Sequence, residues 1–187
     1  NFSIYIKLGL GLIALTYVVI ISFKNKYFKS LKQKFSSTQK TAYFKRLGLK
    51  FISIVILTSL ITLIFYKENL FNALQNNLGQ YFIILGVYVF LSVVPQEFIY
   101  RKFYFQRYKI LFKSDKQLIL INTLVFCIGH LFFNNLLVLA ITLVGGLIFS
   151  LSYLKYQSFK WICIEHSIYG LWLYTIGLGG LLGFPVN

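Results

Sequence analysis

The sequence predicts an all-α protein, a polytopic transmembrane bundle of about six spanning helices with short interfacial helices. Three observations lead to this fold class. Of the 187 residues, 58% are hydrophobic and 12% are charged, whereas soluble domains have roughly 45–50% apolar and about 25% charged residues. The mean hydropathy is +0.73. The apolar residues are gathered into runs of about 20, the length that a helix needs to cross a hydrocarbon core.

The charges are strongly unbalanced, with 19 basic and 4 acidic residues. Nine basic residues lie in residues 24–50 and six in 101–116, between apolar runs. This is the positive-inside pattern of membrane proteins and not the basic stripe of a nucleic-acid-binding domain, so we expect no nucleic-acid partner. We expect a bacterial inner membrane location, with the basic segments 24–50, 101–116 and 155–160 in the cytoplasm and the N-terminus outside.

Each apolar run predicts one span, and consecutive spans run in opposite directions. The predicted spans are residues 2–23, 47–66, 81–97, 117–133, 136–153 and 161–176. The first run is followed by a basic segment instead of a small-residue cleavage site, so we interpret it as a span and not as a signal peptide. We find no internal repeat, and we expect a single integral membrane domain, 1–187, with its core at about residues 81–176.

The connections carry further signals. In segment 24–50, the spacing of aromatic residues and leucine is compatible with a short amphipathic helix on the anionic leaflet and with a solvated basic loop. Residues 67–80 have apolar residues at helical spacing and predict an interfacial helix. We expect Asp115 to cap the fourth span. Gly145 and Gly146 suit close helix packing in lipid.

A few ionisable side chains lie inside runs otherwise apolar enough to enter lipid, where an unpaired charge is costly and by default indicates a function. These residues are Glu97, Arg101, His130, Glu165 and His166. Glu97 and Arg101 are four residues apart on one helix face, in the favourable order for an ion pair. Arg101 therefore either merely neutralises Glu97 or belongs to a functional site.

The loop after the third span decides whether Glu97 and His130 can meet. If the helix that carries Glu97 continues to about residue 112, both residues lie roughly 15–17 residues from the turn and so at similar depth. This arrangement requires Arg101 and Lys102 to be buried or to reach the membrane surface. If the helix ends near Arg101, the two residues lie at different depths.

A glutamate and two histidines in one bundle suit hydrolysis. A desolvated carboxylate can take a proton from water, one histidine can orient that water, and the other can donate to the developing oxyanion. The same set is a plausible zinc shell. The spacing is not the H-E-x-x-H pattern, so we expect no metal or other cofactor, with zinc as the weaker alternative. A proton-coupled transporter is a further alternative, although the sequence has no inverted repeat.

These residues belong to three motifs that resemble a known family. The motifs, in chain order over about residues 91–175, are Gln96-Glu97-x-x-x-Arg101, Phe126-x-x-x-His130 and His166-Ser167-Ile168-Tyr169-Gly170. They are similar to the E-E-x-x-x-R, F-x-x-x-H and H-x-x-x-N motifs of the CAAX protease and bacteriocin-processing (CPBP) family, the Abi or Rce1-like intramembrane proteins.

The resemblance implies a glutamate-dependent endopeptidase that cleaves near or within the membrane, in some members after a prenylated cysteine. It implies that the motif glutamate activates water, that His130 supports it, and that His166 holds the oxyanion with the motif asparagine. The supporting residues are Gln96, Arg101, Phe126, Glu165 and Tyr169. The expected partners are membrane lipid, a membrane-associated peptide or protein substrate, and another membrane protein subunit.

The chain departs from the family pattern at two positions, because Gln96 replaces the first glutamate and Gly170 replaces the asparagine. Gln96 cannot act as a base. Three alternatives follow: Glu97 has taken over the role, the protein is a non-catalytic member that binds a partner or peptide, or Gln96 is an engineered substitution. For the first alternative, the expected catalytic residues are Glu97, His130 and His166. Glu165 offers a second carboxylate, although adjacent helical residues face directions about 100° apart.

Overall fold

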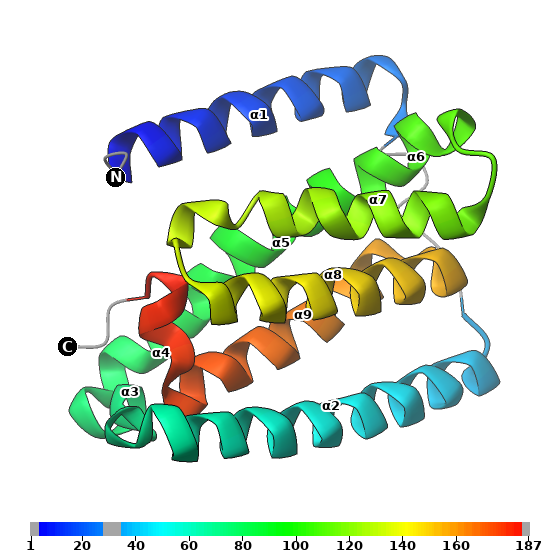
Figure 1. The fold of residues 1–187 in the computed structure, drawn as a ribbon. Coiled ribbons are helices and arrows are strands. Elements are labelled where there is room, and N and C mark those ends of the chain that lie inside the picture. The colour runs from blue at the N-terminus through cyan, green and yellow to red at the C-terminus, as the bar shows by residue number, and fades with distance from the viewer. Residues whose placement is uncertain (1–3, 28–34, 185–187) are drawn as a thin grey trace. The chain divides into compact units, whose positions relative to one another are not determined.

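Helices make up almost all of the chain in the computed structural model, which describes residues 4–27 and 35–184 (Figure 1). No strand occurs in these ranges. The α-helices are α1 (Ile4–Lys24), α2 (Ser37–Phe65), α3 (Asn72–Asn76), α4 (Leu78–Val87), α5 (Val94–Glu97), α6 (Tyr104–Tyr108), α7 (Asp115–Ile128), α8 (Leu136–Tyr156) and α9 (Phe159–Leu173). The π-helices are η3 (Tyr88–Val93), η4 (Phe98–Phe103) and η7 (Tyr174–Leu178), and the 3₁₀-helices are η2 (Lys67–Asn69), η5 (Lys109–Leu111), η6 (Leu131–Phe133) and η8 (Gly179–Leu182). The all-α class is confirmed.

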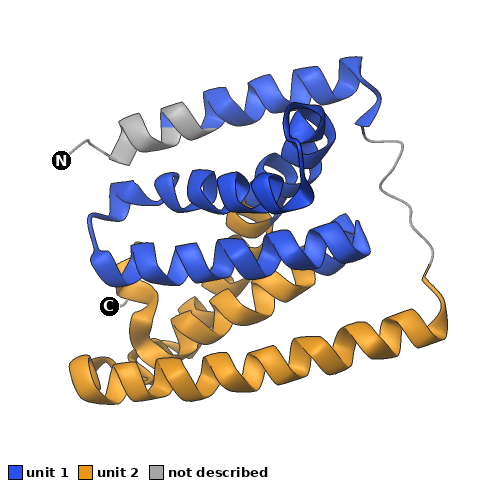
Figure 2. Cartoon of the chain, turned by 45° about the vertical axis from the view of Figure 1, so that its right-hand side comes forward, with its two compact units in different colours: residues 1–33, 94–162 blue, residues 34–93, 163–187 orange. Residues whose placement is uncertain are grey.

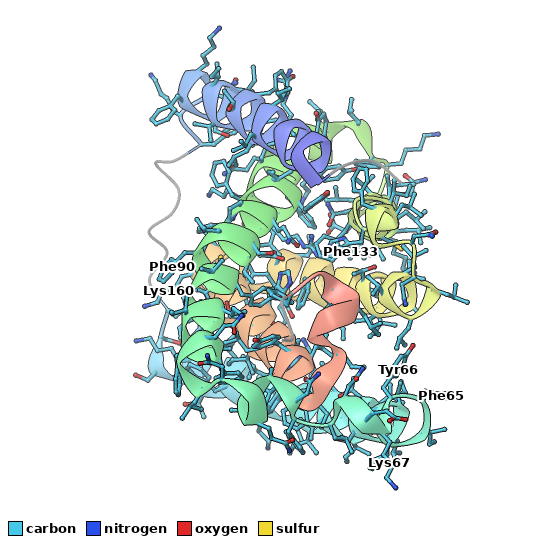
Figure 3. The ribbon with its side chains drawn as sticks, turned by 90° about the vertical axis from the view of Figure 1, so that its left-hand side faces the viewer. Phe65, Tyr66, Lys67, Phe90, Phe133 and Lys160 are labelled. Carbon is cyan, nitrogen blue, oxygen red and sulfur yellow. The ribbon has the colours of Figure 1, made fainter. Side chains whose placement is uncertain are left out.

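Four helical stretches among the described residues are long and apolar enough to cross a membrane: Ser37–Phe65, Leu78–Leu111, Asp115–Phe133 and Leu136–Tyr156. They correspond to the second, third, fourth and fifth predicted spans. The first and sixth predicted spans are helical too, in α1 and in α9 with η7, while the total of six and the sidedness stay predictions. Apolar side chains such as Phe65 (72% exposed) and Phe90 (69% exposed), both labelled in Figure 3, lie on the surface, as lipid contact requires.

The second helix begins at Ser37 and not at residue 47. Ser36 caps it, because its hydroxyl accepts from the Gln39 amide (3.2 Å) while the Gln39 side chain accepts from the Ser36 amide (3.0 Å). This reciprocal capping box starts a helix in polar sequence, which hydropathy does not detect. The predicted basic segment 24–50 is therefore helical from Ser37 onward, and most of its expected amphipathic part lies outside the described residues.

Two further expectations about the connections need correction. Ser114 and not Asp115 caps α7, with its hydroxyl accepting from the Gln117 amide at 3.3 Å. Asp115 is instead the first residue of the helix. The predicted interfacial helix at 67–80 is divided among η2, α3 and the first turn of α4. Phe71 adopts a left-handed backbone conformation (φ 56°) and Asn77 an extended one (φ −154°), and no α-helix continues through either.

The chain forms two compact units, each built from two separate segments (Figure 2). Unit 1 comprises Asn1–Gln33 and Val94–Ile162, and unit 2 comprises Lys34–Val93 and Cys163–Asn187. Of the three boundaries along the chain, the first falls between residues 33 and 34, outside the described residues, the second falls between η3 and α5, and the third falls within α9. The motifs with Glu97 and His130 thus belong to unit 1, and the motif with His166 belongs to unit 2.

In unit 1, α7 and α8 pack against each other (Figure 1). They approach closely at Gly146, where a Cβ atom would lie 3.2 Å from Cδ1 of Phe126 and 3.3 Å from the carbonyl oxygen of Thr123. Small residues permit such approaches between helices in lipid, which confirms the predicted packing role of Gly146. A second contact joins α1 to η4, where Val18, Phe98 and Phe103 form a buried cluster.

In unit 2, α9 packs along α2. The indole nitrogen of Trp172 donates to Oγ1 of Thr58 at 2.9 Å, and the rings of Phe51 and Tyr169 stack with centroids 6.2 Å apart. A buried cluster in the same unit joins α3, α4 and η7; its members are Ala73, Tyr81, Ile84 and Tyr174. These contacts fix the face of α9 that carries Glu165, His166 and Tyr169.

Candidate active site

The helix that carries Glu97 departs from α geometry on both sides of α5. Pro95 has no N–H to donate to the carbonyl of residue 91, and its ring needs space there, which accounts for the wider π turn of η3 just before it. After Glu97 the helix widens again in η4 and continues through α6 and η5 to Leu111. Short π segments inside helices are frequent at functional sites. The continuation to Leu111 meets the condition for Glu97 and His130 to lie at similar depth.

Glu97 and Arg101 form the ion pair that their spacing predicts. Nε of Arg101 lies 3.5 Å from Oε2 of Glu97, and both side chains are 0% exposed. Lys102 is also buried, so both cations meet the requirement stated above by being buried and not by reaching the membrane surface. Gln96, the neighbour that occupies the first motif position, is half-buried.

Arg101 is held by residues of α7 and α8. Its guanidinium carbon lies 4.5 Å from the centroid of the Phe126 ring and 5.6 Å from that of Phe149. Nη2 donates to the carbonyl oxygen of Gly146 at 3.4 Å. Nε and Nη1 make no hydrogen bond within the described ranges. The aromatic faces and the Glu97 carboxylate thus share the charge of a fully buried guanidinium.

His130 lies just beyond α7, whose last residue is Ile128, and precedes η6. Its Nδ1 is 2.7 Å from the carbonyl oxygen of Phe126. A carbonyl oxygen only accepts, so Nδ1 carries the proton and, in the neutral ring, Nε2 is the acceptor. The His130 ring lies 4.7 Å from that of Phe126 and 5.9 Å from that of Phe133, and the residue is half-buried. A neutral imidazole fixed in this tautomer is suited to accept a proton or to orient water.

Phe126 links the two halves of this cluster in unit 1. Its ring contacts Arg101, the partner of Glu97, and its backbone and ring both contact His130. The structure therefore brings together four residues that the sequence assigned to one site. They are Glu97, Arg101, Phe126 and His130.

A buried hydrogen-bond network supports this cluster, and the sequence reasoning missed it. Nδ2 of Asn122 donates to the carbonyl oxygen of Tyr100 at 2.7 Å, and the Ser150 hydroxyl lies 2.8 Å from Oδ1 of Asn122 and 2.7 Å from the carbonyl oxygen of Gly146. Tyr100 is in η4, and its hydroxyl fills the space that a side chain at Gly129 would need, next to His130. Asn122 is a polar residue inside an apolar span, and this was the available signal.

In unit 2, Glu165 is buried (1% exposed) and fully engaged. Its Oε1 accepts from Nζ of Lys50 at 2.9 Å and from the Tyr169 hydroxyl at 3.2 Å, and its Oε2 accepts from the Tyr43 hydroxyl at 3.3 Å. Lys50 and Tyr43 belong to α2. Glu165 and Tyr169 therefore connect α9 to α2, and the acid is held by a cation and two phenols.

His166, the residue after Glu165, is 8% exposed and lies against Tyr88. The two ring centroids are 6.2 Å apart, and the planes meet at 79°. Gly170, one helical turn after His166, is covered by the same tyrosine: a Cβ atom there would overlap the Tyr88 hydroxyl and ring. The space that a longer side chain at Gly170 would occupy is thus filled by a phenol from η3.

Within the part of the chain that the structure describes, no three His, Cys, Asp or Glu side chains are grouped as metal ligands would be. The free cysteines, Cys127 and Cys163, are half-buried. The expectation of no cofactor, with zinc as the weaker alternative, stays a prediction.

The comparisons with known proteins agree with the motifs. The family model described as type II CAAX prenyl endopeptidase Rce1-like matches residues 77–172, just over half of the chain. This range contains Glu97, Arg101, His130 and His166. Neither the curated proteins nor the solved structures include a significant match to the chain. The chain therefore belongs to the Rce1-like family of type II CAAX prenyl endopeptidases, a family of integral membrane proteases.

Proposed function

We propose that this chain is an intramembrane endopeptidase that hydrolyses a peptide bond of a membrane-associated peptide or protein, with Glu97, His130 and His166 as its catalytic residues. The observation that carries the proposal is the cluster in unit 1. There, the His130 imidazole contacts Phe126 directly, and the Glu97 carboxylate is paired with Arg101, whose guanidinium lies against the Phe126 ring. These residues lie within segments apolar enough to span a membrane. We further propose that the protein acts in a bacterial inner membrane, in contact with lipid and with another membrane protein subunit.

The proposed chemistry uses these three residues in turn. Glu97 takes a proton from water while the water oxygen bonds to the scissile carbonyl carbon, and the carbonyl electrons move to its oxygen. His130, with its acceptor nitrogen defined by the bond to Phe126, orients the water. His166 donates a hydrogen bond to the oxyanion. When the C–O double bond re-forms, the C–N bond breaks and the amine leaves with the proton that Glu97 had taken.

A second candidate function is favoured by a specific observation: the Glu97 carboxylate is 0% exposed and paired with Arg101. Together with Gln96 at the first motif position, this arrangement suits a non-catalytic member that binds a partner or peptide. In that case Glu97 and Arg101 serve packing alone. The two candidates make opposite predictions for variants that break the pair from either side.

Cleavage of a quenched-fluorescent, membrane-tethered peptide in proteoliposomes separates the candidates. Glu97→Gln and Arg101→Met break the same ion pair, but only the first removes the base. We expect Glu97→Gln to lower kcat by about 10²–10⁴-fold, the usual contribution of general base catalysis. Arg101→Met should retain a measurable fraction of the activity. Equal cleavage by both variants would contradict a catalytic Glu97.

His130→Ala should also abolish cleavage while the protein stays folded. The non-catalytic alternative instead predicts no turnover by the unaltered chain, none after Gln96→Glu, and co-purification of a membrane partner. Turnover that Gln96→Glu restores to an inactive chain would show that residue 96 is the base position and would exclude Glu97 from that role.

A further inference from the structure

Tyr88 lies directly against Gly170, and the chemistry proposed above assigns a role to neither residue. Both lie in unit 2, Tyr88 at the start of η3 and Gly170 on α9. Any side chain at residue 170 would overlap the phenol, because a Cβ atom there would meet the Tyr88 hydroxyl oxygen, Cζ and Cε1. The absence of a side chain at Gly170 is thus the condition for the hydroxyl to occupy this position.

The hydroxyl is placed beside His166 by helix geometry. Residues 166 and 170 are one turn apart and lie on the same face of α9. A phenol that covers Gly170 therefore lies on the face that carries the imidazole, and the ring contact between Tyr88 and His166 (6.2 Å, 79°) confirms this. Tyr88 is 7% exposed and His166 is 8% exposed. The Phe184 ring, with its centroid 5.2 Å away, packs against the phenol from another direction.

We infer that the Tyr88 hydroxyl is a second hydrogen-bond donor, next to His166, for the oxyanion of the tetrahedral intermediate. This inference rests on the proposed peptidase function and deepens it. A phenol donates well to an anionic oxygen, and preorganised donors in a site screened from water are worth far more than in solution. Tyr88 keeps its proton throughout: the water proton passes to Glu97 and then to the leaving amine, and the phenol only donates a hydrogen bond.

Tyr88→Phe is the first test, because it keeps the ring against His166, Phe184 and Gly170 and removes only the O–H group. With a membrane-tethered peptide in proteoliposomes, we expect kcat to fall by about 100-fold, the lower range for loss of one oxyanion donor. KM should change less than twofold, since the donor acts on a charge that develops only in the transition state. Thermal unfolding in detergent, recorded beside the cleavage assay, shows that the variant is folded.

Tyr81→Phe is the matched control. Tyr81 is a buried tyrosine of the same unit, and its hydroxyl is 2.7 Å from Oγ1 of Thr175, away from His166. We expect a lower melting temperature and an almost unchanged kcat. If Tyr88→Phe cleaves as fast as the unaltered chain, or if both tyrosine variants lower kcat equally, the inference is wrong while the proposed function stands. If the unaltered chain does not cleave, both fail.

Moving the donor from one helix to the other gives an independent test. Tyr88→Ala removes the phenol and vacates the space over Gly170, and Gly170→Asn then places an amide donor there from α9. We expect the double variant to exceed Tyr88→Ala in kcat by at least about tenfold. A folded double variant that is no more active than Tyr88→Ala contradicts the donor role.

Discussion

The Glu97–Arg101 pair allows a quantitative test of how unit 1 is stabilised. Both side chains are 0% exposed, so Glu97→Gln leaves a buried guanidinium without its carboxylate, which costs roughly 3–5 kcal/mol of unfolding free energy. Arg101→Met leaves the carboxylate instead and also removes the contacts with the rings of Phe126 and Phe149, each worth about 0.5–2 kcal/mol. Each single variant should therefore be strongly destabilised.

The double variant Glu97→Gln/Arg101→Met removes both charges together. Replacing a buried pair by uncharged residues of similar size is often nearly neutral, so the remaining loss should be only about 1–4 kcal/mol, from the two ring contacts. We therefore expect the double variant to be more stable than either single variant. If the loss of unfolding free energy in the double variant equals the sum of the losses in the two single variants, the reasoning is refuted, because the effects of independent sites add and those of coupled sites do not.

The assay is equilibrium unfolding in mixed dodecylmaltoside and SDS micelles, followed by tryptophan fluorescence. The chain has two tryptophans, Trp161 in unit 1 and Trp172 in unit 2. All variants are made in a Trp172→Phe background, so that the signal comes from the unit that contains the pair. Lys109→Met is the matched control, since it breaks an exposed pair of the same unit, with Asp115 at 3.4 Å. Exposed pairs contribute about 0–1 kcal/mol, and a Glu97→Gln cost no larger than this control would also refute the reasoning.

Three further predictions concern packing, and each is checked by the melting temperature in detergent. Gly146→Leu should cost about 1–3 kcal/mol or more, because its Cβ would already press on Phe126 (3.2 Å); Gly145→Leu is the control and should be much milder, and equal costs would contradict the close approach of the helices. Gly177→Ala should cost about 1–3 kcal/mol from its backbone alone (φ 110°), besides overlapping a backbone carbonyl; an unchanged melting temperature would argue against this conformation. Asn122→Ala should cost about 1–3 kcal/mol, because the partly buried backbone carbonyl of Tyr100 loses its donor; stability equal to that of the unaltered chain would show that the network contributes nothing to stability.

Much of the fold could be predicted because membrane-spanning helices can be recognised from their amino-acid composition. Uninterrupted apolar runs have few alternatives to a helix in lipid, where each backbone polar group needs a partner within the segment. The prediction failed where polarity conceals a helix. Residues 37–46 are polar, so hydropathy alone placed them outside the second span, in the basic segment 24–50. The Ser36 and Gln39 capping box was visible in the sequence and is the signal that would have moved the helix start.

The site was predictable where its contacts are local in sequence. Glu97 and Arg101 are four residues apart, and Phe126 and His130 are also four apart, so helical spacing alone indicates both contacts. The bond from Asn122 to Tyr100, in contrast, joins residues 22 apart on different helices. Periodicity along one helix carries no information about which polar group of another helix will face it. Such partners become visible only when the helices are packed.

The tyrosine over Gly170 was missed for the same reason. Tyr88 and Gly170 meet only in the folded unit, and the sequence showed the glycine merely as a departure from a motif.

A buried ion pair adds little net stability over apolar residues of the same volume, so stability alone does not account for Glu97 and Arg101 inside a membrane span. Aromatic faces and a backbone carbonyl surround the arginine, and that fixed environment positions the carboxylate. The proposed peptidase needs a positioned carboxylate to activate water, and the proposal therefore offers a reason for a pair that stability alone does not explain.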